Sequence, residues 1–287
     1  MSRTVFLNGS FVPYEQAKLP IMDRGFLFAD GIYEVAAVLD GRLVDNDAHL
    51  ARLDRSLGEI RIRNPYPAAE WTRLEEELVR RNDLQEGLVY MEVTRGVAER
   101  EFAFPGPDVT PTVVMFTQPK TIRHSPQAET GIRVITVPDI RWQRRDIKSV
   151  ALLAQVLAKQ AAAEAGVGEA WMVQDGKVTE GSSSTAFIIT TDRKIVTRPL
   201  SNAILPGITR VAVMRLAGEA GLTVEERLFG VDEAHRAAEA FITSASSLVM
   251  PVVSIDGKPV GDGVPGPLAR RLRALYFGMA EAPAKAA

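Results

Sequence analysis

The stretches Arg145-Asp146-Ile147-Lys148-Ser149 and Val178-Thr179-Glu180-Gly181-Ser182-Ser183-Ser184 are the most informative parts of this sequence. The first offers a lysine and the second a carboxylate, each beside small residues and at the expected edge of a regular element. Downstream, Leu205-Pro206-Gly207-Ile208-Thr209-Arg210 is typical of a helix start, where backbone N–H groups can bind phosphate. Each feature alone is usually a surface, turn or cap residue. Together, an amine, a carboxylate and a phosphate-binding helix start indicate a cofactor site.

The composition excludes several classes of protein. A length of 287 residues is enough for two domains, and 46 % hydrophobic with 24 % charged residues is typical of a soluble globular protein. The net charge of −2 disfavours nucleic-acid binding, and the lack of cysteine excludes disulfides, thiolate metal sites and thiol nucleophiles. No metal is expected, because His49, His124 and His235 lack metal-ligand spacing. Without a signal-peptide core or a membrane-length apolar run, we expect a cytoplasmic protein with no membrane partner.

The pattern of turns and apolar residues predicts a mixed α+β chain in two parts. A small domain is expected over residues 1–118, with hairpin turns at Asn8-Gly9 and Asp40-Gly41. Residues 119–131 lack a hydrophobic period and predict a linker, and residues 132–287 form the larger, cofactor-binding domain. Asp47 is expected to cap a helix. Further helices are predicted at 68–81, 150–165, 209–220, 231–239 and 267–282, and strands at 88–95, 112–117, 132–137, 171–173, 185–190 and 194–197. The helix at 150–165 is amphipathic, with Leu153, Val156, Leu157 and Ala161 on its apolar face.

Ordered motifs extend these observations over nearly the whole chain. They are Asp23-Arg24-Gly25, Phe28-Ala29-Asp30-Gly31-Ile32-Tyr33-Glu34, His49-Leu50-Ala51-Arg52-Leu53, Val93-Thr94-Arg95-Gly96, Asp146-Ile147-Lys148-Ser149, Thr179-Glu180-Gly181-Ser182-Ser183-Ser184, Gly207-Ile208-Thr209-Arg210 and Thr243-Ser244-Ala245-Ser246. In this order the motifs resemble those of the fold-type IV pyridoxal-phosphate enzymes, and most closely the D-amino-acid aminotransferases. The resemblance implies a small N-terminal α/β domain and a larger C-terminal domain with a β-barrel-like core.

The resemblance also implies roles for the cofactor-binding residues. Lys148 matches the lysine that forms a Schiff base with pyridoxal 5′-phosphate and then moves a proton at the substrate Cα. Glu180 matches the carboxylate that keeps the pyridine nitrogen protonated, so that the ring is a strong electron sink. Ala245 also aligns with a loop at the phosphate. Relatives often carry threonine at this position, whereas Ala245 could offer the phosphate only its backbone N–H. The other cofactor-binding matches are Arg52, Ile208, Thr209 and Ser246 at the phosphate, Leu205 against the ring, and Ser184 in the serine-rich motif.

Three further positions concern the substrate: two match the family and one departs from it. Tyr33 resembles the tyrosine beside the substrate carboxylate, and Arg100 the arginine that binds this carboxylate in D-amino-acid aminotransferases. In the family the Arg100 loop reaches the neighbouring subunit, which implies a homodimer with shared active sites. The chain departs from the family at Phe102, where relatives commonly carry histidine. A pocket without this histidine could be more apolar and admit bulkier substrates or (R)-amines.

The implied function is a ping-pong transamination from a D-amino acid to a 2-oxo acid, either 2-oxoglutarate or pyruvate. On the same fold, a branched-chain L-amino-acid transaminase, an (R)-amine transaminase and a 4-amino-4-deoxychorismate lyase remain alternatives. A non-catalytic vitamin-B6-binding protein is an alternative of another class, although the intact Lys148 disfavours it.

Overall fold

The computed structural model describes residues 3–281 and divides the chain into two compact units. The first unit comprises Met1–Thr121 together with Ile147–Ala151, and the second comprises Ile122–Asp146 together with Leu152–Ala287. The segment around Lys148 therefore returns to the first unit. The linker expected at 119–131 contains a short helix, α4 (Pro126–Thr130), whose Ala128 packs in the core of the second unit.

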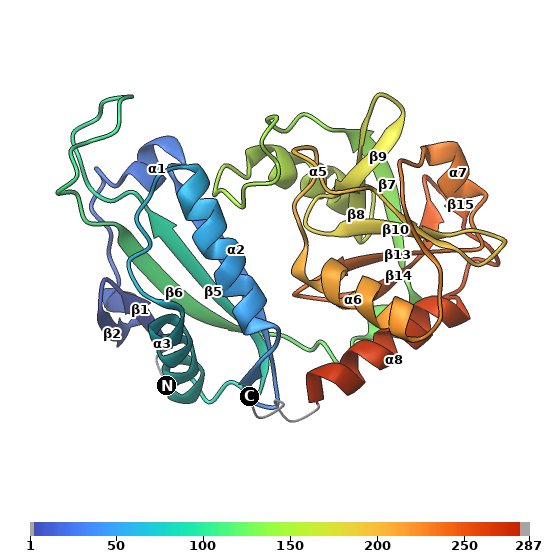
Figure 1. Ribbon diagram of the computed structural model, residues 1–287, viewed down its shortest axis with the longest axis horizontal. Helices are drawn as coiled ribbons and strands as arrows, with labels where there is room; N and C mark the ends of the chain where they lie inside the picture. The colour runs from blue at the N-terminus through green and yellow to red at the C-terminus, as the bar shows by residue number, and fades with distance from the viewer. Residues whose placement is uncertain (1–2, 282–287) are drawn as a thin grey trace. The chain divides into compact units, whose positions relative to one another are not determined.

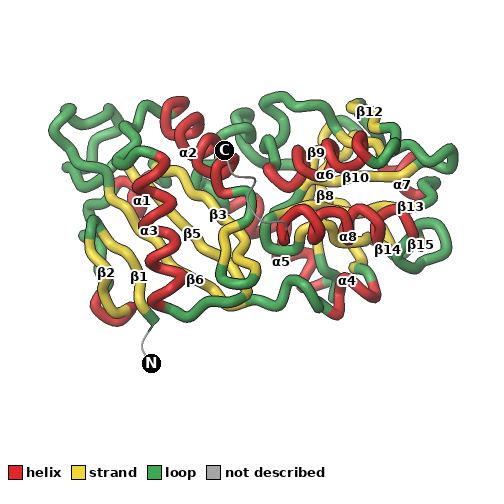
Figure 2. The backbone as a smooth tube through the Cα atoms, turned by 60° about the horizontal axis from the view of Figure 1, so that its bottom comes forward, coloured by secondary structure: helices red, strands yellow, loops and turns green. Residues whose placement is uncertain are grey.

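The first unit is a six-stranded sheet in the order β2-β1-β6-β5-β3-β4, with the two long helices α2 and α3 on one face (Figures 1 and 2). Its pairs are all antiparallel. The elements are β1 (Thr4–Leu7), β2 (Ser10–Pro13), η1 (Tyr14–Gln16), α1 (Arg24–Phe28), β3 (Gly31–Leu39), β4 (Arg42–Leu43), α2 (Asn46–Glu59), α3 (Ala68–Arg81), β5 (Glu86–Thr94) and β6 (Thr112–Pro119).

Both predicted hairpins are confirmed. Asn8 and Gly9 have φ of 46° and 91°, and Leu7 pairs with Ser10, so the turn has two residues. Positive φ at both central positions matches the twist of antiparallel strands. The Asp40-Gly41 turn between β3 and β4 has the same character. The prediction that Asp47 caps a helix was wrong, because α2 begins at Asn46 and Asp47 lies in its first turn.

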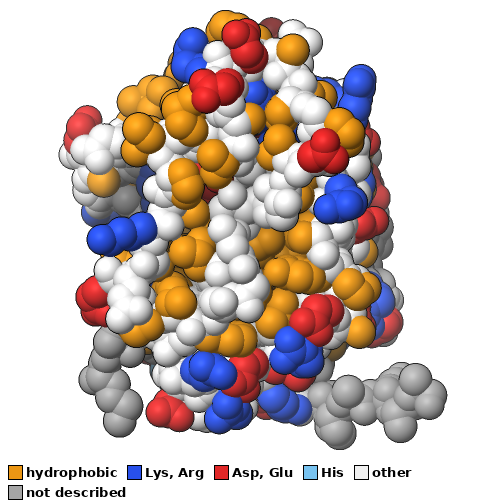
Figure 3. Space-filling model, turned by 90° about the vertical axis from the view of Figure 1, so that its left-hand side faces the viewer, with side chains coloured by type: hydrophobic (Ala, Val, Ile, Leu, Met, Phe, Trp, Pro, Cys, Tyr) orange, Lys and Arg blue, Asp and Glu red, His pale blue; other side chains and the backbone are white. Residues whose placement is uncertain are grey.

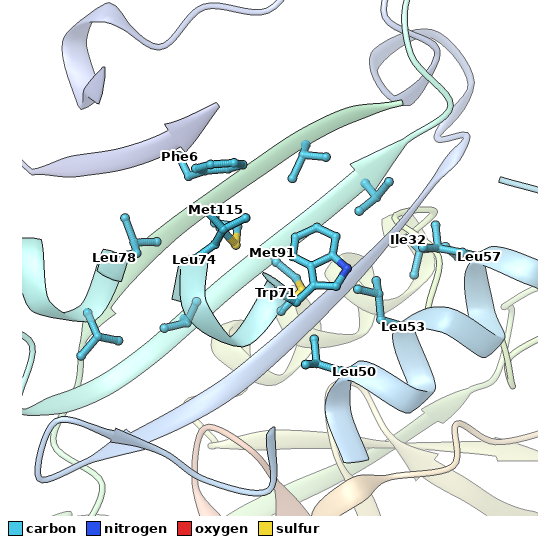
Figure 4. Packing of buried hydrophobic residues seen from close by; sticks show 14 of the residues in the cluster. Phe6, Ile32, Leu50, Leu53, Leu57, Trp71, Leu74, Leu78, Met91 and Met115 are labelled. Atoms are coloured by element: carbon cyan, nitrogen blue, oxygen red, sulfur yellow. The ribbon is translucent and has the colours of Figure 1, made fainter. Parts of the chain in front are cut away.

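The core of the first unit lies between this sheet and its helices (Figure 4). Trp71 of α3 and Leu53 of α2 pack against Met91 of β5 and Met115 of β6, and all four are almost fully buried. Because side chains alternate along a strand, the residues next to Met91 point to the opposite face of the sheet. That opposite face, which α2 and α3 leave uncovered, carries the candidate site of this unit.

The second unit is built on a nine-stranded sheet in the order β12-β11-β10-β13-β14-β7-β8-β9, with β15 paired to β14. The sheet curls, since β9 at one end of this order contacts β10, which confirms the expected barrel-like core. Its other elements are β7 (Ile132–Pro138), α5 (Leu153–Glu164), β8 (Glu169–Gln174), β9 (Lys177–Gly181), β10 (Thr185–Ile189), β11 (Ile195–Thr197), α6 (Ile208–Glu219), β12 (Val224–Glu226), α7 (Val231–His235), β13 (Glu239–Ser244), β14 (Leu248–Ile255), β15 (Lys258–Pro259) and α8 (Pro267–Glu281).

Helix α5 differs from its prediction in where it begins and in which face it buries. It starts at Leu153, three residues later than expected, and packs on its sheet through Ala158 and Ala162. The predicted apolar face is instead exposed, with 73 % of Leu153 and 52 % of Leu157 accessible to solvent. Across residues 3–281, none of the helices combines the length and the hydropathy needed to span a bilayer.

Candidate functional site

Lys148 is fixed against strand β3 of the first unit. Its carbonyl oxygen accepts a hydrogen bond from the Tyr33 N–H at 3.0 Å, and the Val150 N–H donates to the Gly31 carbonyl at 3.0 Å. These bonds hold the segment as an additional edge along β3. The Lys148 amine lies 4.1 Å from the centre of the Tyr33 ring. The structure thus brings together the predicted lysine and the predicted substrate tyrosine.

Arg52 is not a solvated helix residue but belongs to a buried ionic cluster. Its Nε and Nη2 donate to the two oxygens of Glu34 at 2.7 and 2.8 Å, and His49 Nδ1 lies 2.8 Å from the same carboxylate. Burial by itself raises the pKa of Glu34, but Arg52 and His49 outweigh this and lower the pKa well below its ordinary value. Glu34 is therefore ionised and holds the guanidinium plane of Arg52 in one orientation.

Arg100 and Phe102 lie in the loop between β5 and β6. The Arg100 guanidinium carbon is 5.4 Å from the ring centre of Phe28 in α1 and 5.7 Å from that of Phe102. Phe102 itself is 80 % exposed. At the base of the loop, Arg95 donates two hydrogen bonds to Asp30, at 2.7 and 2.9 Å. The loop is thus anchored at its base and presents an arginine and an apolar ring at its surface.

Glu180 lies near the end of β9 in the second unit, with its carboxylate buried. It forms an ion pair with Arg141 and accepts the Leu205 N–H at 3.1 and 3.2 Å. Arg141 is itself bound by Asp139 at 2.7 Å. Burial raises the pKa of Glu180, whereas Arg141 and the Leu205 N–H act in the opposite direction. The carboxylate is thus held rigidly, next to the backbone of the predicted ring-packing residue.

The serines after Glu180 are bound to a second buried carboxylate. Glu169 of β8 accepts hydrogen bonds from the hydroxyls of Ser182, Ser183 and Ser184, the last at 3.1 Å. The predicted cofactor-binding Ser184 therefore has a partner within the protein. This arrangement fixes the turn that follows Glu180.

The start of helix α6 has the features of an anion-binding site. Gly207 precedes the helix, and no side chain caps the N–H groups of the first turn, which includes Ile208 and Thr209. A Cβ on Gly207 would lie 2.8 Å from the Thr185 hydroxyl, so a larger residue would not fit without movement. Ala245 and Ser246 lie in the turn between β13 and β14, and α6 contacts β13.

Sequence reasoning missed several residues that shape these clusters. Glu34 and His49 lie inside quoted motifs, and the spacing of His49 and Arg52 on one helix face is the signal that could have suggested a shared partner. Arg141 and Glu169 gave no signal, because Arg141 pairs with Glu180, 39 residues along the chain, and Glu169 with the serines of a later turn.

Known proteins place the chain in a family. The model of the family described as "Amino-transferase class IV" matches residues 31–255. A D-alanine aminotransferase from Staphylococcus aureus is 42 % identical over 94 % of this chain and 95 % of its own length, and one from Bacillus licheniformis is 41 % identical over 94 % of both.

Solved structures of aminotransferases have a similar fold. A branched-chain amino acid aminotransferase from T.th., solved with pyridoxamine 5′-phosphate, is 26 % identical, covers 98 % of this chain with 94 % of its own, and has a TM-score of 0.88. The Escherichia coli branched-chain amino acid aminotransferase, at 23 % identity and a TM-score of 0.90, shows the same fold over 99 % of this chain and 97 % of its own. The chain belongs to the class IV aminotransferases.

Proposed function

We propose that the chain is a pyridoxal 5′-phosphate-dependent transaminase that moves the amino group of a D-amino acid to a 2-oxo acid in two half-reactions. The observation that carries the proposal is the placement of Lys148, whose amine projects over Tyr33 on the helix-free face of the first-unit sheet. The 42 % identity to a D-alanine aminotransferase supports the substrate class, and the T.th. structure with pyridoxamine 5′-phosphate supports the cofactor.

The residues present fit this cofactor in chemistry. Its phosphate needs oriented donors, which the uncapped N-terminus of α6 can supply through the Ile208 and Thr209 N–H groups. Arg52, held by Glu34, would add a charge-assisted contact. A protonated ring nitrogen needs a carboxylate, and Glu180 is buried and fixed from one side by Arg141.

When bound, pyridoxal 5′-phosphate supplies an electron sink for negative charge at the substrate Cα. Lys148 would hold the cofactor covalently and, once the substrate amine has displaced it, take the proton from Cα. Glu180 would keep a proton on the ring nitrogen. Arg100 and Tyr33 would bind the α-carboxylate and so decide which face of Cα meets the Lys148 amine.

We further propose a homodimer with shared active sites. Apolar side chains at two places support it: Phe102 and Phe104 in the Arg100 loop are 80 % and 52 % exposed, and the Leu153 and Leu157 face of α5 is uncovered. Figure 3 shows one face of the molecule, with hydrophobic side chains across its centre. Exposed apolar surface of this kind often marks an interface. A cytoplasmic location stays a prediction of the sequence.

A substrate panel tests the proposed function. The purified enzyme is given D-amino acids, L-branched-chain amino acids, (R)-amines and 4-amino-4-deoxychorismate, and the absorbance of the bound cofactor is followed in each half-reaction. We expect D-amino acids to react fastest. A faster reaction with (R)-amines would indicate that the enzyme prefers substrates without a carboxylate, as Phe102 in place of histidine could allow. Elimination of pyruvate from 4-amino-4-deoxychorismate would show that the enzyme is a lyase and not a transaminase.

A further inference from the structure

Arg100 lies at the centre of a tight turn in the loop between β5 and β6. The Glu101 N–H donates to the Glu99 carbonyl at 2.9 Å, which closes a three-residue turn around Arg100. The Arg100 guanidinium lies near the rings of Phe28 and Phe102, and within residues 3–281 no carboxylate or carbonyl accepts a hydrogen bond from it. Its donors are therefore available to a substrate carboxylate, and their direction depends on how the turn is held.

The first residues of this loop pair with the chain that leads into helix α1. The Arg24 N–H donates to the Gly96 carbonyl at 2.9 Å, and the Ala98 N–H donates to the Met22 carbonyl at 3.3 Å. An isolated antiparallel bridge lies between these two bonds. In the described part of the chain this backbone pairing ends at Ala98, two residues before Arg100, so the turn itself needs another support.

The side chain of Arg24 provides this support. It is 3 % exposed, its Nη1 donates to the Glu101 carbonyl at 2.6 Å, and its Nε donates to the Asp30 carboxylate at 2.8 Å. Asp30 also binds Arg95, which in turn donates to two backbone carbonyls at the C-terminal end of α2 at 2.7 and 3.0 Å. A buried guanidinium thus connects the turn around Arg100 to the core of the first unit.

We propose that Arg24 is a positioning residue for substrate binding, which acts by holding the turn that carries Arg100. This inference rests on the proposed function, because it takes Arg100 to bind the substrate α-carboxylate. In the proposed homodimer Arg100 reaches the neighbouring subunit, and Arg24 acts on it from within the subunit that carries both. Phe102 offers no hydrogen-bond donor, so the carboxylate depends on the position of Arg100 more strongly than it would with histidine there.

The two hydrogen bonds of Arg24 are of a kind that fixes position. The bond to Asp30 joins opposite charges, which makes it stronger than a neutral hydrogen bond. The planar guanidinium donates in two fixed directions at once, so Asp30 and the Glu101 carbonyl are held at a constant separation. Misplacement of a binding group by about 1 Å can lower a reaction rate about a hundredfold. Loss of the Arg24 side chain should therefore weaken the contact between Arg100 and the substrate, although Arg24 itself is buried.

A double-mutant cycle with Arg24→Gln and Arg100→Ala tests the inference, with D-alanine as the donor and 2-oxoglutarate as the acceptor. Arg24→Gln alone should lower kcat/KM for D-alanine roughly tenfold or more, mainly through a higher Michaelis constant. In the Arg100→Ala background the same substitution should change kcat/KM by less than about twofold, because the turn then carries no arginine to position. A role in folding alone would lower Tm in both backgrounds, and the two kinetic effects would then multiply.

Arg3→Gln is the matched control, because Arg3 makes the same kinds of contact elsewhere in the first unit. Its Nη1 donates to the Thr117 carbonyl at 3.3 Å. Its guanidinium carbon lies 4.7 Å from the ring centre of Tyr14, as that of Arg24 lies 4.7 Å from the ring centre of Phe28. This variant should keep the wild-type kcat/KM. If Arg24→Gln does not fold, Arg24→Lys takes its place in the cycle, because lysine keeps the charge but lacks the fork that reaches two acceptors.

Three results would overturn the role of Arg24: an unchanged kcat/KM in the Arg24 variant, effects of the two substitutions that multiply in the double variant, or an equal loss in Arg3→Gln. An Arg100→Ala enzyme with the wild-type kcat/KM would overturn it as well, because Arg100 would then not bind the carboxylate. If the wild type transaminates no D-amino acid, the proposed function itself fails and the role of Arg24 falls with it.

Discussion

Replacing Glu34 with glutamine should destabilise the first unit far more than the loss of one surface charge does. Glu34 is fully buried and is the shared acceptor for Arg52, which is 7 % exposed, and for His49. Glutamine has the same shape, but one of its two terminal atoms is a donor and would face a donor of Arg52 or His49. The variant therefore leaves a buried guanidinium without its counter-charge.

Breaking a buried ion pair in this way costs about 3–5 kcal/mol. For a protein of this size, 1 kcal/mol shifts Tm by about 2–4 °C, so the expected fall in Tm is roughly 6–20 °C. The pKa of Glu34 lies well below its ordinary value of 4.5. Its contribution to stability is thus present above pH 4.5 and is lost as the pH falls further, so wild type and variant should converge in acid.

Differential scanning calorimetry at pH 7 measures the shift, with Glu77→Gln as the control. Glu77 accepts hydrogen bonds from Arg80 and Arg81 at 2.7 and 2.6 Å, and these lower its pKa too, but the pairs are on the surface. Exposed pairs contribute little to stability, so this variant should melt almost as the wild type does. Equal Tm values for the Glu34 and Glu77 variants would refute the role given to burial.

Four further outcomes are expected. Arg100→Ala should lower kcat/KM for D-amino acids at least about tenfold more than for (R)-amines, because only D-amino acids lose a charge-assisted carboxylate contact. Phe102→His should shift the preference toward substrates with a carboxylate. Steady-state kinetics with both substrate classes tests these two predictions. Glu75→Gln should raise Tm above that of the wild type by an amount that grows from pH 4.5 to 8. Burial raises the pKa of Glu75 to about 8, so ionisation above pH 4.5 favours the unfolded state of the wild type. A constant difference in Tm between variant and wild type across this pH range would contradict the prediction. Leu157→Asp on the exposed face of α5 should convert a dimer into monomers in light scattering, and an unchanged mass would remove α5 from the interface.

Local signals were enough to predict the hairpins and most helices. Asn8-Gly9 and Asp40-Gly41 encode their turns through positive φ, a property of the residues themselves. Strands β13 and β14 were not predicted, because almost every residue of Ala240–Thr243 and Leu248–Val253 is apolar or small and buried on both faces, so the period of two disappears. Helix α7 ends at His235, earlier than expected, since β13 begins at Glu239.

The candidate site could be predicted only as far as single residues carry chemistry. Lys148 and Glu180 stood out because an amine and a carboxylate near turns have few structural uses together. The partners that orient the site residues, such as Glu34 for Arg52 and Arg141 for Glu180, come from distant parts of the sequence. Long-range pairing of this kind depends on the register of strands and helices, which no local pattern encodes. The apolar face of α5 was expected to be buried, but it is exposed. The hydrophobic period of a helix reveals an apolar face, but it does not show whether that face packs against the same chain or against a partner.

The most direct test of the central claim is to locate the covalent attachment of the coenzyme. The purified yellow protein is reduced with borohydride and digested, and the modified peptide is sequenced by mass spectrometry. The coenzyme should be found on the peptide that contains Lys148, and a Lys148→Arg protein should carry none. Its recovery on another lysine such as Lys159, or its absence from a fully active enzyme, would contradict the account.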